Sequence, residues 1–224
     1  MEFMLEYYEV LKKSPLFAGA DENALSHILR CMEAHICIYG KGEIIYHYGE
    51  PVSRAGIVLE GKAALIAPGM DGDESHIRFA GPAEAFGCSN SCLLDQPALV
   101  MVLAKKRTKI LFLKVSKLFR PEALGCAYAG LVTVNLLKQT AAENLAQNLR
   151  IHIMSQKSIR DKLKLMLSQI SPDGKNALLS MNRQELADYL GVERSALSRE
   201  MARMKKEGLI DYRKNEITIL YQTA

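Results

Sequence analysis

Gly191 interrupts a helical pattern within the stretch RQELADYLGVERSALSRE, and this interruption constrains the fold more than any other feature of the sequence. Before the glycine, Leu186 and Leu190 are four residues apart, which places both on one face of a helix. Asn182 and Glu185 have capping-box spacing at the start of that helix. Because glycine adopts the left-handed conformation at a helix end at little cost, the stretch predicts a short helix that stops at Gly191.

A second helix is predicted to start near Glu193. Leu197, Met201 and Met204 follow the i, i+4, i+7 spacing of a buried helix face. Two short helices joined by a glycine turn form a helix-turn-helix, whose second helix can enter the major groove of DNA. An ordinary helical hairpin with a solvated charged face is the alternative. The open face of the second helix carries four polar residues: Arg194, Ser195, Ser198 and Arg199.

The segment after this helix favours the DNA-binding interpretation over the hairpin alternative. Gly208 ends the helix, and residues 209–212 and 216–220 have the composition of two short strands around a tight turn near Lys214. Such a hairpin beside the two helices is a wing, and it brings Arg213 and Lys214 within reach of phosphate. We therefore expect a winged helix-turn-helix at the C-terminal end.

The charge distribution supports a phosphate-bearing partner such as double-stranded DNA. The net charge of the 224-residue chain is +4. From Arg150 onward, 14 Lys and Arg stand against 9 Asp and Glu, so this segment carries +5 and the first 149 residues carry −1. The basic surplus thus belongs to the segment with the helix-turn-helix. We predict that Arg194 and Arg199 read base edges with Ser195 and Ser198 beside them, and that Arg183, Arg213 and Lys214 meet phosphate.

The first half of the chain has the sequence pattern of a β-rich domain. Two helices are expected before about residue 32, and from about His35 short β-rich runs follow one another, separated by glycines. Strands at roughly ten-residue spacing with glycine turns indicate an antiparallel sandwich or barrel. No helical segment long enough for a parallel crossover interrupts them. The fold class is therefore expected to be α+β.

A long helix is predicted from about Pro121 to Leu149, because apolar residues recur there at spacings of three and four, close to a coiled-coil seam. We expect the helix to pair with a second copy in a homodimer, and a helix lying on its own sandwich is the alternative. The expected domains are 1–120, 121–150 and 151–224. The predicted dimer interface comprises Leu124, Leu131, Val134, Leu137, Ala141 and Leu145.

Several functional classes are excluded by what the sequence lacks. There is no run of eighteen apolar residues and no export signal, so we expect a cytoplasmic protein without membrane contact. Five cysteines without zinc-finger spacing are interpreted mainly as small buried residues. There is no Walker loop, zinc-protease helix or GxSxG motif, and the five histidines are scattered, so neither an enzyme nor a metal site is expected.

The order of β-rich domain, long helix and winged helix-turn-helix resembles the bacterial Crp/Fnr family, which includes cyclic-AMP receptor proteins. The resemblance covers nearly the whole chain and is carried by NRQELADYLGVERSALSREMARMKKEGLI and by KGEIIYHYGEPVSRAGIVLEGKAALI. It implies an N-terminal antiparallel β-roll like a cyclic-nucleotide-binding domain, a long dimerisation helix and a C-terminal winged helix-turn-helix. It also implies a homodimeric transcription factor on palindromic DNA, a small-molecule effector in the β-roll and, for an activator, contact with RNA polymerase.

The expected effector pocket departs from the family pattern. Cyclic-nucleotide-binding members carry Phe-Gly-Glu and, after a short helix, Arg-Ser-Ala, whereas this chain reads FGCSNSCLLDQPA. Phe86 and Gly87 match, but Cys88 replaces the glutamate, Gln96 the arginine and Pro97 the serine. A neutral amide cannot neutralise a buried phosphate, and proline removes a backbone N–H. We therefore expect no cyclic nucleotide, and either an empty pocket or a less charged or apolar effector.

The recognition helix also departs from the family pattern. Arg194 and Arg199 match, but Ser195 stands where many members carry glutamate, and serine is less selective among bases. The preferred half-site is thus expected to differ from the family's commonest one. Glu200 falls where an apolar residue is usual, which predicts a change in how the helix packs.

Cys88 and Cys92 offer an alternative function. Their four-residue spacing can place both sulfurs on one helical face, as in a redox- or metal-responsive regulator. A reactive thiol needs exposure and a lowered pKa, which the sequence does not supply. FNR-type iron–sulfur ligation needs an N-terminal cysteine cluster that this chain lacks, so we expect neither haem nor an iron–sulfur cluster, and no other cofactor.

Overall fold

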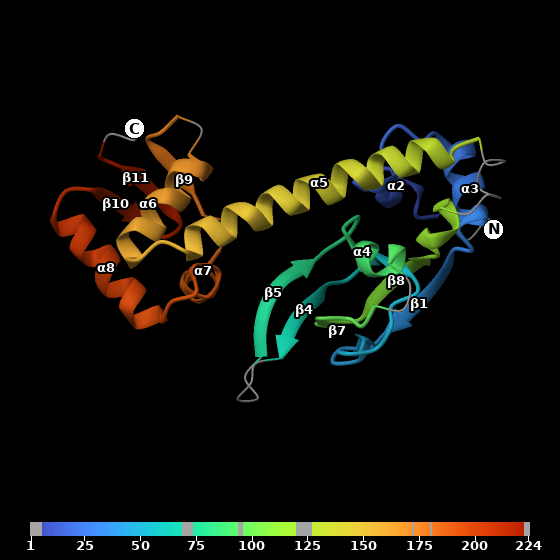
Figure 1. Ribbon diagram of the computed structural model, residues 1–224, viewed down its shortest axis with the longest axis horizontal. Helices are drawn as coiled ribbons and strands as arrows, with labels where there is room; N and C mark the ends of the chain where they lie inside the picture. Colours follow the sequence, from blue (N-terminus) through green and yellow to red (C-terminus); the bar gives the residue numbers. More distant parts are fainter. Residues whose placement is uncertain are drawn as a thin grey trace. The chain divides into compact units, whose positions relative to one another are not determined.

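The computed structural model describes residues 6–68, 74–93, 96–119, 127–171, 173–179 and 181–221. The chain forms two compact units, one up to Ala142 and the other from Glu143, and the boundary falls inside helix α5 (Ala129–Met154). Each unit has its own apolar core. Figure 1 shows a β-rich fold in the first unit and a cluster of short helices in the second. Among the described residues, no helix combines the length and apolarity needed to cross a membrane.

Two four-stranded antiparallel sheets form the β-domain and share an apolar core. One sheet has the order β1-β8-β3-β6 and the other β2-β7-β4-β5. The core between them includes Val58 and Ile110 from the first sheet and Leu65 and Val102 from the second. The expected antiparallel β-domain of an α+β protein is therefore confirmed. The strands are β1 (His35–Tyr39), β2 (Ile44–Tyr46), β3 (Ala55–Glu60), β4 (Ala63–Pro68), β5 (Glu74–Ala80), β6 (Ala85–Phe86), β7 (Met101–Ala104) and β8 (Thr108–Leu113).

Strand β3 is buried on both faces. Val58 faces the core between the sheets, whereas Ile57 and Leu59 belong to a second core beneath the helices. This alternation follows from the two-residue period of a strand. The helical elements of the unit are α2 (Tyr8–Leu11), η1 (Pro15–Phe17), α3 (Glu22–Cys31), α4 (Cys88–Cys92) and η2 (Val115–Phe119).

Gly61 makes the tight connection between β3 and β4. Its φ is +100°, and a Cβ at this position would lie 2.6 Å from the Cα and 2.5 Å from the Oγ1 of Thr108. The same threonine hydroxyl accepts from the backbone N–H of Lys62 at 3.2 Å. No residue with a side chain fits this turn without a shift of the backbone.

Helix α5 packs one face on the N-terminal unit. Val132 and Leu136 belong to its core, and the Asn135 side-chain amide donates to the backbone oxygens of Leu16 at 3.2 Å and Ala18 at 2.8 Å. The helix starts at Ala129 and continues to Met154, beyond the predicted end at Leu149. The predicted start at Pro121 lies outside the described residues. The alternative of a helix lying on its own sandwich thus holds for this face, and the opposite face is described below.

The C-terminal unit is a helix-turn-helix with a three-stranded wing sheet. The predicted capping box at Asn182 and Glu185 is present, and Gly191 ends α7 with φ +61°. Strand β9 was not predicted; it pairs with β11 and gives the order β10-β11-β9. The elements are α6 (Ile159–Ile170), β9 (Asn176–Leu178), α7 (Arg183–Leu190), α8 (Arg194–Lys206), β10 (Ile210–Arg213) and β11 (Glu216–Ile219).

Candidate DNA-binding surface and effector pocket

The open face of α8 carries the residues that the sequence places there. Leu197, Met201 and Met204 are buried in the core of the C-terminal unit. The Ser195 hydroxyl donates to the carboxylate of Glu193, the N-cap residue. The structure leaves the four predicted base-reading and neighbouring residues exposed together on one side of the helix: Arg194, Ser195, Ser198 and Arg199.

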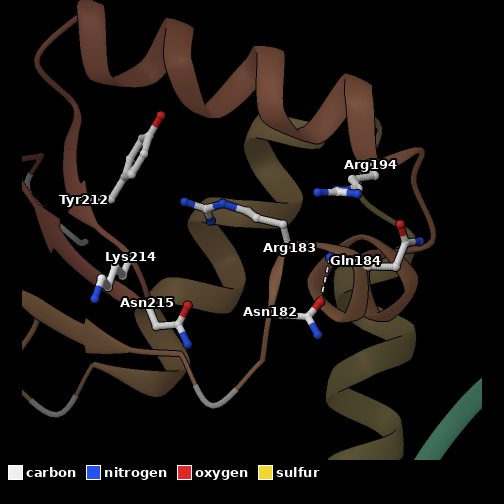
Figure 2. Close-up of a pocket in the computed structure, with 7 residues that line it drawn as sticks. All are labelled: Asn182, Arg183, Gln184, Arg194, Tyr212, Lys214 and Asn215. Carbon is white, nitrogen blue, oxygen red and sulfur yellow. Dashed lines mark hydrogen bonds between the residues drawn. The ribbon is translucent and has the colours of Figure 1, made fainter.

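A groove of about 490 Å³ runs between the start of α7, the start of α8 and the wing (Figure 2). It brings together Arg183, Arg194 and Lys214, three of the predicted DNA contacts, from three separate elements. Three cations along one groove suit a chain of phosphates. The complete lining is Asn182, Arg183, Gln184, Arg194, Tyr212, Lys214 and Asn215.

Arg183 forms part of the groove wall and is half-buried. Its Nη1 donates to the sulfur of Met201 at 3.0 Å, and its Cζ lies 4.9 Å from the centroid of the Tyr212 ring. Burial lowers the pKa of the Arg183 guanidinium from its usual value. The ammonium of Lys205 lies 5.1 Å from the same ring centroid. Sequence reasoning missed Tyr212, whose ring contacts Arg183 of α7 and Lys205 of α8 and so ties the wing to both helices.

Arg213 and Lys214 lie at the turn of the wing, and both are exposed. Arg213 is opposite Glu216 in the β10–β11 register, and Lys214 has φ +54° in the tight turn. Lys214 lines the groove, whereas Arg213 does not. The wing thus presents two exposed cations, and Lys214 is the one that lines the groove.

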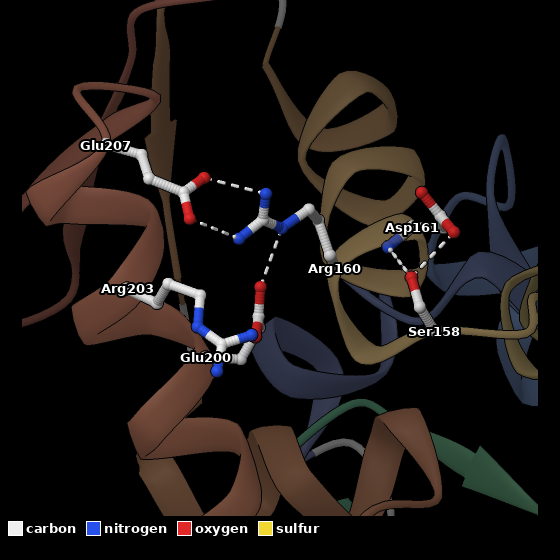
Figure 3. Close-up of polar contacts among 6 residues, drawn as sticks. All are labelled: Ser158, Arg160, Asp161, Glu200, Arg203 and Glu207. Atoms are coloured by element: carbon white, nitrogen blue, oxygen red, sulfur yellow. Dashed lines mark hydrogen bonds and ion pairs between the residues drawn. The ribbon is translucent and has the colours of Figure 1, made fainter.

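A second groove, of about 540 Å³, lies on the other side of α8, against the start of α6. Arg199 lines it together with Glu200. The Glu200 carboxylate accepts from the Nε of Arg160 at 2.6 Å, as Figure 3 shows. Sequence reasoning missed Arg160. The sequence feature that could have indicated this contact is Glu200, a charged residue at a position that is usually apolar. Its partner Arg160 lies forty residues away in the sequence, so the pair could not be identified from the sequence.

The five predicted effector residues are split between two environments. Phe86 and Cys88 are buried, and a methyl group at Gly87 would lie 2.8 Å from Cε2 of Tyr46. Gln96 and Pro97 are exposed. The Asn90 amide of α4 donates to the Pro97 carbonyl oxygen at 3.4 Å and so links the two parts. Residues 94 and 95 between them lie outside the described ranges.

A cavity of about 290 Å³ lies in the β-domain, and none of the five predicted effector residues lines it. Tyr46 separates it from Gly87, and the Tyr46 hydroxyl donates to the Arg54 carbonyl oxygen at 2.5 Å. Burial raises the pKa of the Tyr46 phenol well above its usual value. The alternation in HICIY signals this cavity, because it puts His35, Cys37 and Tyr39 on one strand face. The lining is His35, Cys37, Tyr39, Ile45, Tyr46, His47, Glu50, Pro51, Val52, Ser53, Arg54 and Phe112.

The two cysteines of α4 differ in burial. Cys88 is buried, and burial raises the pKa of the half-buried Cys92 thiol. A raised pKa lowers the thiolate fraction, and the thiolate is the reactive form. In the part of the chain that the structure describes, no cluster of three or more His, Cys, Asp or Glu residues is arranged to hold a metal ion.

The exposed face of α5 carries most of the predicted dimer residues. Val134 is 50% exposed, Leu137 68% and Leu145 70%, and Ala141 is exposed on the same face. We call these four residues the α5 stripe. Leu131 instead packs partly against the core of its own unit, with its Cδ1 3.6 Å from the position of a Cβ on Gly19. Leu124 lies outside the described residues.

Comparison with known proteins supports both units. Residues 37–120 match the model of the cyclic nucleotide-binding domain, and residues 162–223 match the Crp-like helix-turn-helix domain. The chain is 26% identical over 202 residues to the cyclic AMP receptor protein of Thermus thermophilus, with 89% of each chain covered.

Solved structures share the fold. The catabolite activator protein of Thermus thermophilus is similar with a TM-score of 0.57 at 24% identity, covering 92% of this chain and 93% of that one. The c-di-GMP-responsive global regulator CLP of Xanthomonas campestris has a TM-score of 0.63 at 18% identity, with coverages of 91% and 100%. With both domain matches in this order along one chain, the protein belongs to the Crp/Fnr family of transcriptional regulators.

Proposed function

We propose that the protein is a homodimer that binds inverted-repeat operators and responds to an effector other than a cyclic nucleotide. The observation that carries the DNA-binding part is the open face of α8, on which Arg194, Ser198 and Arg199 are exposed beside the groove against the wing. An exposed basic helix flanked by a basic wing fits a major groove between two phosphate backbones.

The proposed contacts follow from where each side chain lies. Arg194 and Arg199 read base edges, with guanine as the preferred partner of a bidentate arginine, and Ser195 and Ser198 lie beside them. Lys214 and Arg213 meet phosphate at the wing. Arg183 meets phosphate along the groove wall, from a position fixed by Tyr212 and Met201. As an activator, the dimer would also contact RNA polymerase.

Homodimerisation is supported by the α5 stripe. Its large apolar side chains are exposed on the face opposite to Val132 and Leu136, which pack on the N-terminal unit. A stripe of this spacing along a 26-residue helix is what a two-stranded seam requires. A second copy would bury it in a symmetric interface.

The effector is proposed to carry little charge. Gln96 and Pro97 offer no cation for a phosphate, and Tyr46 closes the space against Gly87. The 290 Å³ cavity has aromatic walls, among them Tyr39 and Phe112. Arg54 also lines it, but its guanidinium donates to the carbonyl oxygen of Glu33 at 2.9 Å and to the Glu33 carboxylate at 3.4 Å, so these surroundings suit a compact molecule of low charge. One similar protein is named for cyclic AMP and another for c-di-GMP, so the shared fold does not decide the effector. The redox alternative gains no support, because burial raises the pKa of Cys92.

Calorimetric titration with cyclic AMP and with cyclic GMP is expected to give no binding heat at micromolar concentrations. Burying a phosphate charge costs several kcal/mol unless a cation or several donors meet it. The cyclic AMP receptor protein of Thermus thermophilus, titrated with cyclic AMP under the same conditions, is the positive control. A dissociation constant in the micromolar range for either nucleotide would contradict the proposal.

DNA binding is tested first by genome-wide mapping of bound sites, which should yield an inverted repeat with half-sites one duplex turn apart, roughly 34–36 Å. On that operator, Arg194→Ala should cost about 1–3 kcal/mol and relax one position of each half-site, because a base-edge contact is lost. Lys214→Ala should weaken binding to every sequence alike, because only a phosphate contact is lost. The slope of the logarithm of affinity against the logarithm of salt concentration should become shallower by about one.

Lys157→Ala is the matched control for these variants. Lys157 is an exposed cation of the C-terminal unit outside α8 and the wing. Its loss should leave the base preference unchanged at every operator position, including the one that Arg194→Ala relaxes. The assignment of roles is wrong when Arg194→Ala and Lys214→Ala lose specificity to the same degree.

A further inference from the structure

Arg160 holds two carboxylates of the recognition helix at once. Its Nε donates to Glu200 at 2.6 Å, and its two terminal nitrogens donate to the two oxygens of Glu207 at 2.7 and 3.0 Å (Figure 3). Arg160 lies in the first turn of α6, whereas Glu200 and Glu207 are seven residues apart along α8 and its C-cap. All three nitrogens of the Arg160 guanidinium thus connect α6 to one flank of α8.

The hydrogen bonds of Arg160 restrict the orientation of α8 more tightly than the apolar contacts of α8 do. Two of the three buried anchors of α8 are Met201 and Met204, and methionine is unbranched and adapts to many shapes. A methionine-rich seam fills the interface but constrains rotation of the helix only weakly. A planar guanidinium bonded to one carboxylate through two nitrogens allows a narrow range of angles.

Glu200 lies directly after Arg199 and lines the same groove. Its side chain is only 15% exposed, and its other described partner is Arg203, at 3.5 Å, whose side chain is 69% exposed. Without Arg160, the Glu200 carboxylate would depend on that solvated partner. The rotation of α8, and with it the direction of Arg199, would then depend mainly on the adaptable contacts of Met201 and Met204.

We infer that Arg160 is a positioning residue for DNA recognition, which holds α8 in the rotation that presents Arg194 and Arg199 to base edges. This inference rests on the proposed DNA-binding function. Arg160 lies on the α6 flank and acts through Glu200 and Glu207, not through the DNA. Its loss should therefore affect the discrimination between sequences more than the attraction to DNA in general.

The test compares affinity for the selected operator with affinity for random-sequence duplex of the same length. Arg160→Ala and Arg160→Lys should each lower that ratio roughly tenfold, about the cost of one misread base pair. Arg160→Lys keeps the charge but loses the fork, so it separates geometry from charge. Lys157→Ala, which removes an exposed cation just before α6, should leave the ratio within about twofold.

A triple variant separates positioning from simple charge cancellation. In Arg160→Ala combined with Glu200→Gln and Glu207→Gln, the two carboxylates that Arg160 holds can no longer repel phosphate, and the fork is absent. If Arg160 positions α8, the ratio stays low while affinity for random DNA rises. If Arg160 only cancels two negative charges, the triple variant recovers the ratio and the inference is overturned.

Circular dichroism and thermal melting accompany each variant. If Arg160→Ala loses its fold, Arg160→Lys and the single Glu200→Gln variant make the comparison, and an unchanged ratio in both overturns the inference. Failure of the proposed function is distinct, because the unaltered protein would then show no preference for any selected DNA over random duplex.

Discussion

Replacing Leu137 by glutamate should convert the protein to a monomer and lower its affinity for an inverted repeat by roughly a hundredfold or more, because two linked half-sites lose their avidity. Leu137 is 68% exposed at the centre of the α5 stripe, so the substitution leaves the core of its own unit intact. In a symmetric seam the new carboxylate would face its own copy across an apolar interface. Sedimentation velocity and a binding titration on the full repeat measure the two effects.

Gln147→Glu is the control, since Gln147 is exposed on the same helix but points away from the stripe. This variant should remain dimeric and bind normally. The dimer proposal fails if the unaltered protein sediments as a monomer, or if Leu137→Glu stays dimeric and keeps its affinity for the repeat.

Gly61→Ala should lower the free energy of unfolding of the N-terminal unit by about 2–5 kcal/mol. A left-handed conformation costs an L-residue about 1–2 kcal/mol, and an overpacked contact about 1–3 kcal/mol more. Both terms apply at Gly61, because its φ is +100° and the new methyl group would lie 2.6 Å from the Thr108 Cα. Urea denaturation, followed by the signal of the β-domain, measures the loss.

Gly42→Ala isolates the conformational term. Gly42 has φ +88°, but nothing lies within 4 Å of a Cβ there. It should therefore cost only about 1–2 kcal/mol. Equal losses for the two variants would show that the close approach of Thr108 to Gly61 contributes nothing.

The helices of the C-terminal unit were predictable because each depends on residues close together in the sequence. The capping box at Asn182, the left-handed Gly191 and the spacing of Leu197 and Met201 all act within one or two turns. Strand β9 was missed because it has three residues, too few for a period, and it exists only through its pairing with β11. The apolar spacing of α5 was recognised, but the partial packing of Leu131 on the core of its own unit was not predicted, because its contact with Gly19 depends on the tertiary structure.

The site was predicted less completely than the fold. Exposure of Arg194 and Arg199 follows from helical spacing alone, and Lys214 from the hairpin turn. The network of Arg160 with Glu200 joins residues forty apart, and the sequence shows only that Glu200 is unusual. The aromatic cavity of the β-domain is lined by β1, β2, β8 and a loop, and no motif marks it apart from the alternation around Cys37.

The position of the unit boundary inside α5 has a consequence for protein engineering. The boundary after Ala142 falls between Leu137 and Leu145. These two residues lie on one stripe only because the eight residues from one to the other make little more than two helical turns. One residue inserted after Ala142 would carry Leu145 about 100° around the helix. A chimera that exchanges DNA-binding units between relatives therefore has to keep helical phase across the junction, and insertions of about seven residues are the ones that the proposed seam would tolerate.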